Sequence, residues 1–388
     1  MTDGESDIKQ ADMQGYEFRY GPQLISGPGA ARRLAELLPE GRCLFVTDAN
    51  VRGLGLADAV LRALPDTVVF DAVEEDPSRE TLMAAVAAGE GCVSVVGFGG
   101  GSPMDVAKLA AYLIATGEDL DTLWGVGKAR GKRLPLALVP TTAGTGSEAT
   151  AVTVITVGGS EKRGVNSPAL NADWAVLDAE LTLTLPRHVT AATGIDAMVH
   201  AIEAYTSALK KNPLSDLLAR EALRLLAGNL DEAVHNGSNR VARQAMLLGA
   251  CLAGQAFANA PVAAVHALAY PLGGNFHIPH GLSNALVLPQ VLRFNVSAAT
   301  THYGELAPIV LGDRLRTDDP STYAEQLIQE FEQMSARVGL PTRLRDAGVP
   351  EDMLPQLAKE AMLQQRLLVN NPREVTEADA LAIYRAAY

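Results

Sequence analysis

The stretch that decides the fold is CVSVVGFGGGSPMDVAKLAAYLIAT, from Cys92 to Thr116. It opens with a short apolar run, passes through four glycines in five residues, and continues with apolar residues three to four positions apart. The first run is typical of a buried strand and the last of an amphipathic helix. Glycines at such a junction let the backbone turn sharply and approach a ligand closely, and a helix N-terminus attracts phosphate. We therefore expect a strand, a phosphate-binding loop and a helix, with Ser102 as the N-cap and Pro103 as the first helical residue.

The same alternation continues on both sides of this stretch. Strands that alternate with helices predict an α/β domain with a parallel sheet, which we place at residues 16–187. A β-rich run, AVTVITV (151–157), is expected to pair as an extra hairpin. The other strand-like runs are CLFVTD (43–48), DTVVFDAV (66–73) and LPLALVPTT (134–142), and the helical runs cover residues 29–38, 56–64, 78–89 and 103–116.

The sequence changes character after Pro186. Strand-like runs almost disappear, and this predicts an all-helical second domain at residues 188–388. Residues 1–15 show no hydrophobic periodicity and predict a disordered tail. Long helical periodicity covers residues 215–234, 240–257, 323–339 and 377–388.

The composition supports two soluble domains and excludes several kinds of partner. A chain of 388 residues that is 48% hydrophobic exceeds the size at which single cores usually divide. No apolar run of about 18 residues is present, and the acidic, polar N-terminus is unlike a signal peptide, so we expect a cytoplasmic protein that does not enter the membrane. The net charge of −13 argues against a nucleic-acid partner. Three scattered cysteines, Cys43, Cys92 and Cys251, are expected to be reduced core residues.

Two further segments are candidates for nucleotide binding. Asp48 ends the strand-like run CLFVTD and precedes the glycine loop, whereas the acidic residue of a standard dinucleotide fingerprint follows its glycines by about twenty residues. Asp48 therefore either holds a ribose or caps a helix. The segment PTTAGTGSE (140–148) follows the fourth strand-like run and offers hydroxyl groups without steric bulk. It is either a solvated turn or, as we expect, a second loop that converges with the glycine loop on one ligand.

Four side chains are candidates for a metal centre. Asp196 and His200 are four residues apart, so on a helix both project from one face. His266 and His280 are separated by a segment that contains Pro271-Leu272-Gly273-Gly274, which we expect to turn the chain and bring the two imidazoles together. One carboxylate and three imidazoles suit a divalent metal such as Fe²⁺ or Zn²⁺. Taken alone, Asp196 and His200 would more simply form a hydrogen bond at a helix start.

The motifs GGGSPMDVAK, PTTAGTGSE, GIDAMVHAIEAY and HALAYPLGGNFHIPHGLSNALVLP resemble those of the iron-containing (group III) alcohol dehydrogenase family, in the same order and spacing. The resemblance runs from about Tyr16 to the end of the chain. It implies the dehydroquinate synthase-like architecture, with an α/β dinucleotide-binding domain, an all-α domain and a metal in the cleft between them. It also implies a homodimer or larger homo-oligomer, and a metal held by Asp196, His200, His266 and His280.

The resemblance further implies where the cofactor binds. Phe257 would lie near the nicotinamide and the substrate. A carboxylate at Asp48 would repel a 2′-phosphate, which favours NAD over NADP. The cofactor-binding residues that the resemblance implies are Gly99, Gly100, Gly101 and Ser102 for the pyrophosphate, with Asp48, Asp105, Thr141, Thr142, Thr145 and Lys162 around them.

One position departs from the pattern of many family members. They carry a second histidine four residues after the first, where this chain has Tyr270. A tyrosine with an ordinary pKa of about 10 relays protons less readily than an imidazole. His277 either takes over the relay or makes a local hydrogen bond in its loop. Some branches, including the hydroxyacid–oxoacid transhydrogenases, are similar in having HxxxY here.

The expected function is hydride transfer between a small alcohol held at the metal and nicotinamide C4, or the reverse reduction of an aldehyde or ketone. A transhydrogenase acting on hydroxy acids is one alternative within this chemistry. A non-redox lyase of the dehydroquinate synthase type is an alternative of another class, although a phosphorylated substrate would require more basic residues near the site. A protein that binds NAD and metal without turnover is the third.

Overall fold

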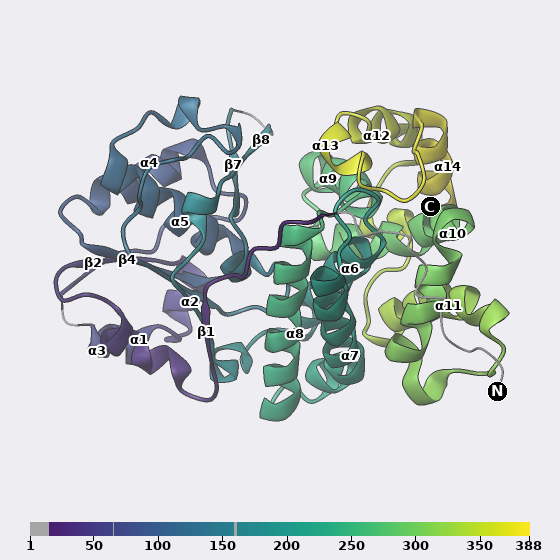
Figure 1. Cartoon of the computed structure of the whole chain (residues 1–388), viewed down its shortest axis with the longest axis horizontal. Coiled ribbons are helices and arrows are strands. Elements are labelled where there is room, and N and C mark those ends of the chain that lie inside the picture. The colour runs from purple at the N-terminus through teal and green to yellow at the C-terminus, as the bar shows by residue number, and fades with distance from the viewer. Residues whose placement is uncertain (1–14, 65, 159–160) are drawn as a thin grey trace, which may run out of the picture.

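The computed structural model describes residues 15–64, 66–158 and 161–388. It consists of an α/β part and a helical part that lie side by side (Figure 1). Of the tail expected at residues 1–15, all but Gly15 lies outside the described residues. No single described helix is long and apolar enough to cross a membrane; the pair formed by residues 240–259 and 264–276 meets that test when joined but is bent by 108°.

A six-stranded sheet, parallel throughout, forms the centre of the α/β part. The predicted parallel sheet is therefore confirmed, and two strands that the sequence analysis did not identify, β1 and β9, complete it at one edge. Every residue of β2, β4 and β6 is buried, as their continuous apolar runs indicate. In sheet order, the strands are β1 (Gln23–Ser26), β9 (Trp174–Leu177), β6 (Leu136–Pro140), β4 (Ser94–Gly99), β2 (Cys43–Val46) and β3 (Thr67–Phe70).

Helices cover both faces of this sheet. On β2, Leu44 and Val46 pack toward α4 and α5, whereas Phe45 packs toward the other face with α1, α2 and α3. This is the alternation expected of side chains along a strand. The predicted helix at 29–38 is only a 3-10 turn, η1 (Ala30–Arg33), followed by a short α1. The covering helices are α1 (Leu34–Leu37), α2 (Ala49–Gly53), α3 (Asp58–Ala63), α4 (Arg79–Ala88) and α5 (Gly101–Thr116).

The start of α5 differs from the prediction by two residues. Gly100 is the N-cap and the helix begins at Gly101, so Ser102 and Pro103 occupy its second and third positions. Proline is tolerated there because the first amides of a helix have no intrahelical acceptor. Ser102 is therefore part of the first helical turn rather than its cap.

A small second sheet projects from the α/β part on the side nearest α9 and α13 (Figure 1). Strands β7 (Val152–Thr156) and β8 (Lys162–Asn166) form the antiparallel hairpin that the sequence predicts, and β5 (Gly125–Val126) pairs parallel to β8. Short 3-10 turns lie in the connections of this part: η2 (Leu120–Thr122), η3 (Ser147–Ala149), η4 (Pro168–Leu170) and η5 (Ala179–Thr182).

From Arg187 onward the described residues form helices and their connections. Helix α6 lies at the centre and is buried along most of its length, because α7, α8 and α10 pack around it. The helices are α6 (Arg187–Thr206), α7 (Pro213–His235), α8 (Arg240–Asn259), α9 (Ala264–Phe276), α10 (His280–Leu311), α11 (Tyr323–Arg337), α12 (Leu354–Ala361), α13 (Gln365–Leu368) and α14 (Glu377–Ala387), with 3-10 turns η6 (Gly312–Arg314), η7 (Pro320–Thr322), η8 (Leu344–Ala347) and η9 (Glu351–Met353).

The turn that brings α9 and α10 together is not where the sequence predicted it. Pro271 and the two glycines after it lie inside α9, which continues to Phe276. The chain reverses at His277, which adopts a left-handed conformation with φ 54°, and Pro279 then precedes the first residue of α10. The cysteines agree with expectation, since Cys43, Cys92 and Cys251 are free and buried.

Candidate metal centre and cofactor site

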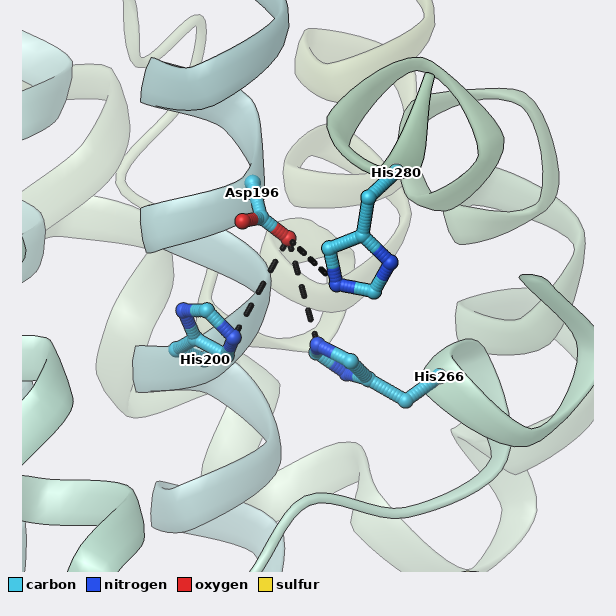
Figure 2. Close-up of side chains that lie close together, drawn as sticks. All are labelled: Asp196, His200, His266 and His280. Atoms are coloured by element: carbon cyan, nitrogen blue, oxygen red, sulfur yellow. Dashed lines mark ion pairs between the residues drawn. The ribbon is translucent and has the colours of Figure 1, made fainter. Parts of the chain in front are cut away.

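Three helices bring four metal-ligating side chains to one point. Asp196 and His200 project from α6, His266 from the first turn of α9, and His280 from the start of α10 (Figure 2). One donor atom from each lies within 4.8 Å of the other three. Asp196, His200 and His266 are buried, whereas the side chain of His280 is 43% exposed. The cluster is therefore accessible on the side of His280.

The distances within the cluster are too long for direct hydrogen bonds. The Nε2 atoms of His200, His266 and His280 lie 4.0, 3.9 and 3.6 Å from Asp196 Oδ1. Hydrogen bonds between nitrogen and oxygen are about 2.7–3.2 Å long. The four side chains thus converge without satisfying one another, and one carboxylate with three imidazoles is a donor set that fits a divalent transition metal.

The protonation states of His200 and Asp196 suit a cation. Burial lowers the pKa of His200 to about 3, so this imidazole is neutral at physiological pH. Burial acts to raise the pKa of Asp196, but the neighbouring imidazoles and a hydrogen bond outweigh it, and the pKa is lowered. A neutral imidazole and an ionised carboxylate are the forms that bind a metal.

Two residues that the sequence analysis did not identify orient these side chains. Glu203 Oε2 lies 2.6 Å from His266 Nδ1, and its other oxygen accepts a hydrogen bond from the Val265 amide at 2.7 Å. Asn284 donates from Nδ2 to Asp196 Oδ1 at 2.6 Å, and the same nitrogen lies 3.3 Å from Nε2 of His266 and of His280. Holding Nδ1 of an imidazole leaves Nε2 directed at the cluster. Helical spacing could have identified both residues, since Glu203 is seven residues after Asp196 on α6 and Asn284 is four residues after His280 on α10.

The structure separates the three catalytic candidates. The Phe257 ring, on α8, stacks on His200 with 4.4 Å between centroids, and the Tyr270 ring lies 6.0 Å from that of His280. Burial raises the pKa of Tyr270, so the phenol keeps its proton at neutral pH. His277 is exposed, and among the described residues its side chain forms no hydrogen bond. The local hydrogen bond expected of His277 is instead made by its backbone amide, to Gly273.

The glycine loop lies beside Asp48. Gly99 has φ 151°, and a Cβ there would come within 2.8 Å of the Pro103 ring and 3.2 Å of Asp48 Oδ2. The other carboxylate oxygen, Oδ1, caps α2 by accepting from the Val51 amide at 2.9 Å. The two interpretations of Asp48 are thus compatible, because one oxygen serves as the helix cap while the other faces the loop.

The second loop lies against the first; that the two bind one ligand stays a prediction. The Thr141 amide donates to Gly99 O at 2.9 Å, and a Cβ on Gly101 would lie 3.0 Å from Thr145 Cγ2. Thr142 lies next to Gly100, with 3.8 Å from its Oγ1 to a Cβ built there. At its far end the loop packs on α6, where a Cβ on Gly144 would meet Thr193 at 2.7 Å. This loop therefore links the glycine loop to the helix turn that precedes Asp196.

Two of the expected cofactor residues are engaged within the protein. Asp105 accepts hydrogen bonds from Ser147 Oγ at 2.7 Å and the Val154 amide at 2.9 Å, so both of its oxygens are used. Lys162 on β8 forms an ion pair with Asp76 at 2.6 Å. Asp105 is on α5, and its carboxylate is directed toward η3 and β7, where Ser147 and Val154 supply the internal partners that a largely buried carboxylate requires.

Comparison with known proteins identifies one family over nearly the whole chain. Residues 21–179 match the sequence profile described as iron-containing alcohol dehydrogenase, and residues 190–388 match the C-terminal profile of the Fe-containing alcohol dehydrogenase family. The chain is similar to long-chain-alcohol dehydrogenase 1 of Geobacillus thermodenitrificans, with 42% identity over 92% of this chain and 93% of that protein.

Solved structures agree with this. A crystal structure of 1,3-propanediol oxidoreductase superposes with a TM-score of 0.91 and 36% identity, covering 96% of this chain and all of that one. A sulfoacetaldehyde reductase from Bifidobacterium kashiwanohense, in complex with NAD⁺, superposes with a TM-score of 0.85 and 29% identity over 96% of this chain and 98% of that one.

Proposed function

The chain belongs to the iron-containing alcohol dehydrogenase family, and from this premise we propose that it is a metal-dependent enzyme that moves a hydride between an alcohol and NAD. The observation that carries the proposal is the convergence of Asp196, His200, His266 and His280 donor atoms within 4.8 Å. These residues would hold a divalent metal, with Fe²⁺ the expected ion and Zn²⁺ the alternative. A cation held there supplies charge that polarises an alcohol or carbonyl oxygen.

The chain's own residues supply binding and orientation. The first amides of α5 and the glycines before them offer donors to a pyrophosphate, and the Thr141, Thr142 and Thr145 loop adds hydroxyl groups. Asp48 Oδ2 would accept from an adenosine ribose and repel a 2′-phosphate, which favours NAD over NADP. Because the Thr loop also packs on α6, a dinucleotide laid along it would direct its nicotinamide end toward His200 and Phe257.

Around the reacting atoms, we assign different tasks to the neighbouring side chains. Phe257 presents an apolar ring beside His200 and excludes water from one side. Tyr270 keeps its proton and acts as a hydrogen-bond donor rather than as a general base. His277, exposed at the turn between α9 and α10, has a backbone role in reversing the chain.

The finer proposals concern location and assembly. We propose a cytoplasmic enzyme that forms a homodimer or a larger homo-oligomer. Strands β1 and β3 are the two edges of the parallel sheet, and an edge strand carries unpaired backbone groups that a second copy can pair with. Light scattering during size-exclusion chromatography measures the assembly directly.

Elemental analysis of anaerobically purified protein, combined with a screen for alcohol-dependent NADH formation, tests the proposed function. We expect close to one iron or zinc per chain, activity with small primary alcohols or diols, loss of activity with a chelator, and recovery with Fe²⁺ or Zn²⁺. A metal-loaded protein that forms no NADH with any alcohol, diol or hydroxy acid would contradict the proposal and favour the lyase or the non-catalytic alternative.

A further inference from the structure

A polar pocket of about 200 Å³ lies between the end of α10 and α11. Helix α11 is on the side of the helical part that faces away from the sheet (Figure 1). Helix α10 runs from His280 to Leu311, and at 1.5 Å per residue its 32 residues span up to about 48 Å. Leu311 lines the pocket, so the pocket is at the opposite end of α10 from the candidate metal ligand His280.

Positively charged side chains predominate in the lining of this pocket. Arg314 comes from η6, Arg316 from the connection after it, and Arg337 from the last residue of α11. Among the described residues that line the pocket, Glu330 alone is acidic, and the other polar ones are glutamines. The lining therefore carries an excess of positive charge, in a chain whose net charge is −13.

A buried carboxylate holds two of the three arginines. Glu330 is 4% exposed, and its Oε1 lies 3.1 Å from Arg314 Nε and accepts from Arg337 Nη2 at 2.8 Å. Arg314 Nη2 also donates to the Val310 carbonyl at 3.0 Å, and Arg337 Nε to Asp231 Oδ2 at 2.9 Å. In both guanidinium groups this leaves Nη1, for which no described residue supplies an acceptor. Two anchored nitrogens hold the third at a defined position, as recognition of a ligand requires.

The third arginine has an anchored backbone and an unpaired side chain. The Arg316 amide donates to Gln326 Oε1 at 2.8 Å, and the buried Gln326 in turn donates to Thr322 Oγ1 at 2.8 Å. The Arg316 side chain is exposed, and no carboxylate among residues 15–64, 66–158 and 161–388 forms an ion pair with it. A third positive charge beside two others costs electrostatic free energy, which an anion in the pocket would offset.

These donors suit a phosphate group better than a carboxylate. A carboxylate presents two oxygens in one plane, and a single guanidinium fork can satisfy both. A phosphate group presents at least three oxygens in a tetrahedral arrangement and carries about 1.5 to 2 negative charges at pH 7. The pocket offers donors from three separate side chains, so a phosphate group can accept from all three.

We propose that this pocket binds a small phosphate-bearing ligand, either inorganic phosphate or a phosphate monoester, through Arg314, Arg316 and Arg337. Glu330 positions two of these arginines and does not contact the ligand. The site is distinct from the pyrophosphate site proposed at the glycine loop, which is in the α/β part. A ligand in the pocket connects the end of α10 to the end of α11, and it should stabilise the folded protein by mass action.

Titration calorimetry on the metal-loaded protein tests this proposal, with NAD present in excess to fill the glycine loop. The probes are inorganic phosphate, glycerol 3-phosphate and succinate at one ionic strength. We expect a phosphate-bearing probe to bind at one per chain, and more weakly as salt is raised. In Arg316→Met its affinity should fall about 10–100-fold, the usual effect of losing a charge-assisted hydrogen bond. Arg385→Met, at an exposed position on α14, is the matched control and should bind like the wild type.

A second variant keeps the test independent of any folding defect in the first. Arg314→Met leaves Glu330 paired with Arg337 and should weaken phosphate binding by a similar factor, and the melting temperature without phosphate shows whether each variant is folded. Tighter binding of glycerol 3-phosphate than of phosphate would support a monoester as the ligand, and the reverse order would support free phosphate.

Three results would overturn the proposal. Equal phosphate affinity in the wild type and in folded Arg316→Met and Arg314→Met would place the anion at the glycine loop or the metal instead. Succinate that binds as tightly as both phosphate-bearing probes would refute the assignment of a phosphate group. Absence of binding with every probe would mean that the arginines form a solvated ion-pair network only.

Discussion

Each half of the molecule contains a cluster of buried charged and polar side chains, and the two clusters differ in how their atoms are satisfied. In the α/β part, Lys108 is fully buried and donates to Ser147 Oγ at 2.6 Å and to Val152 O at 2.7 Å. Asp105 lies 3.5 Å from the same ammonium and accepts from Ser147 and Val154. We call Asp105, Lys108 and Ser147 the α5 network.

The metal cluster in the helical part shows the opposite pattern. Its three imidazole nitrogens lie 3.6 to 4.0 Å from one oxygen of Asp196, beyond hydrogen-bond distance. The inner atoms converge instead on Asn284 Nδ2, which lies 2.6 Å from Asp196 Oδ1 and 3.3 Å from Nε2 of His266 and of His280, while Glu203 holds His266 from the other side of its ring. Buried polar groups are normally paired, so a network whose members pair with one another is structural. Four metal-ligating groups that converge on one point without pairing with one another form a donor set that suits a cation.

The largest expected effect is loss of a candidate ligand. His200→Ala should reduce bound metal to a small fraction of one per chain and reduce NADH formation by more than the 10–100-fold that loss of an outer partner typically costs. Elemental analysis and steady-state kinetics measure both. His188→Ala is a matched control, because this exposed imidazole is on the same helix, and it should keep its metal. Full metal content in His200→Ala would remove the distinction between the two clusters.

Loss of Lys108 should affect stability instead of metal content. Lys108→Met leaves Asp105 and the Val152 carbonyl without their buried cationic partner, and breaking a buried ion pair typically costs about 3–5 kcal/mol. Urea unfolding of the metal-free protein measures this change. The exposed Lys132→Met in the same part of the chain should stay within about 0.5 kcal/mol of the wild type. A Lys108→Met protein as stable as the wild type would show that the α5 network is not structural.

Glu148 gives the α5 network a dependence on pH. It is 2% exposed next to Lys108, and burial raises its pKa from 4.5 to about 7. The folded state therefore binds more protons than the unfolded state between these values, and Glu148 lowers stability as pH rises through this range. At about 1.4 kcal/mol per pKa unit, the free energy of unfolding of Glu148→Gln, relative to that of the wild type, should rise by at most about 3 kcal/mol between pH 5 and pH 8. Urea unfolding at both values tests this, and a constant difference would contradict it.

The sequence predicts features of both halves where the deciding contacts are local. Asp196 and His200 are four residues apart on one helix, so local geometry alone brings them to the same face. The parallel sheet likewise follows from short apolar runs that alternate with helices, as at β4 and α5. In both cases the deciding contacts lie within a few residues of each other along the chain.

Contacts between distant segments are harder to predict. The turn between α9 and α10 is at His277 and not at Pro271, because packing of α9 outweighs the helix-breaking tendency of an internal proline. Tyr384 lies 116 residues after Leu268, and no spacing in the sequence indicates that the Tyr384 hydroxyl donates to the Leu268 carbonyl. Glu203 was predictable in principle from its helical spacing, and it also provides the mildest test of the metal cluster.

Glu203→Gln should weaken metal binding without removing a ligand. Glutamine keeps the shape of the side chain and can still accept from the Val265 amide, but it loses the negative charge 2.6 Å from His266 Nδ1 that holds the imidazole and makes it more basic. Metal affinity should fall about 10–100-fold, as is typical for loss of an outer partner, and competition with a chelator of known affinity measures it. Glu221→Gln, a partly exposed position on α7, is the control and should bind metal like the wild type. Wild-type affinity in Glu203→Gln would mean that Glu203 only joins α6 to α9, and that His266 is oriented by packing alone.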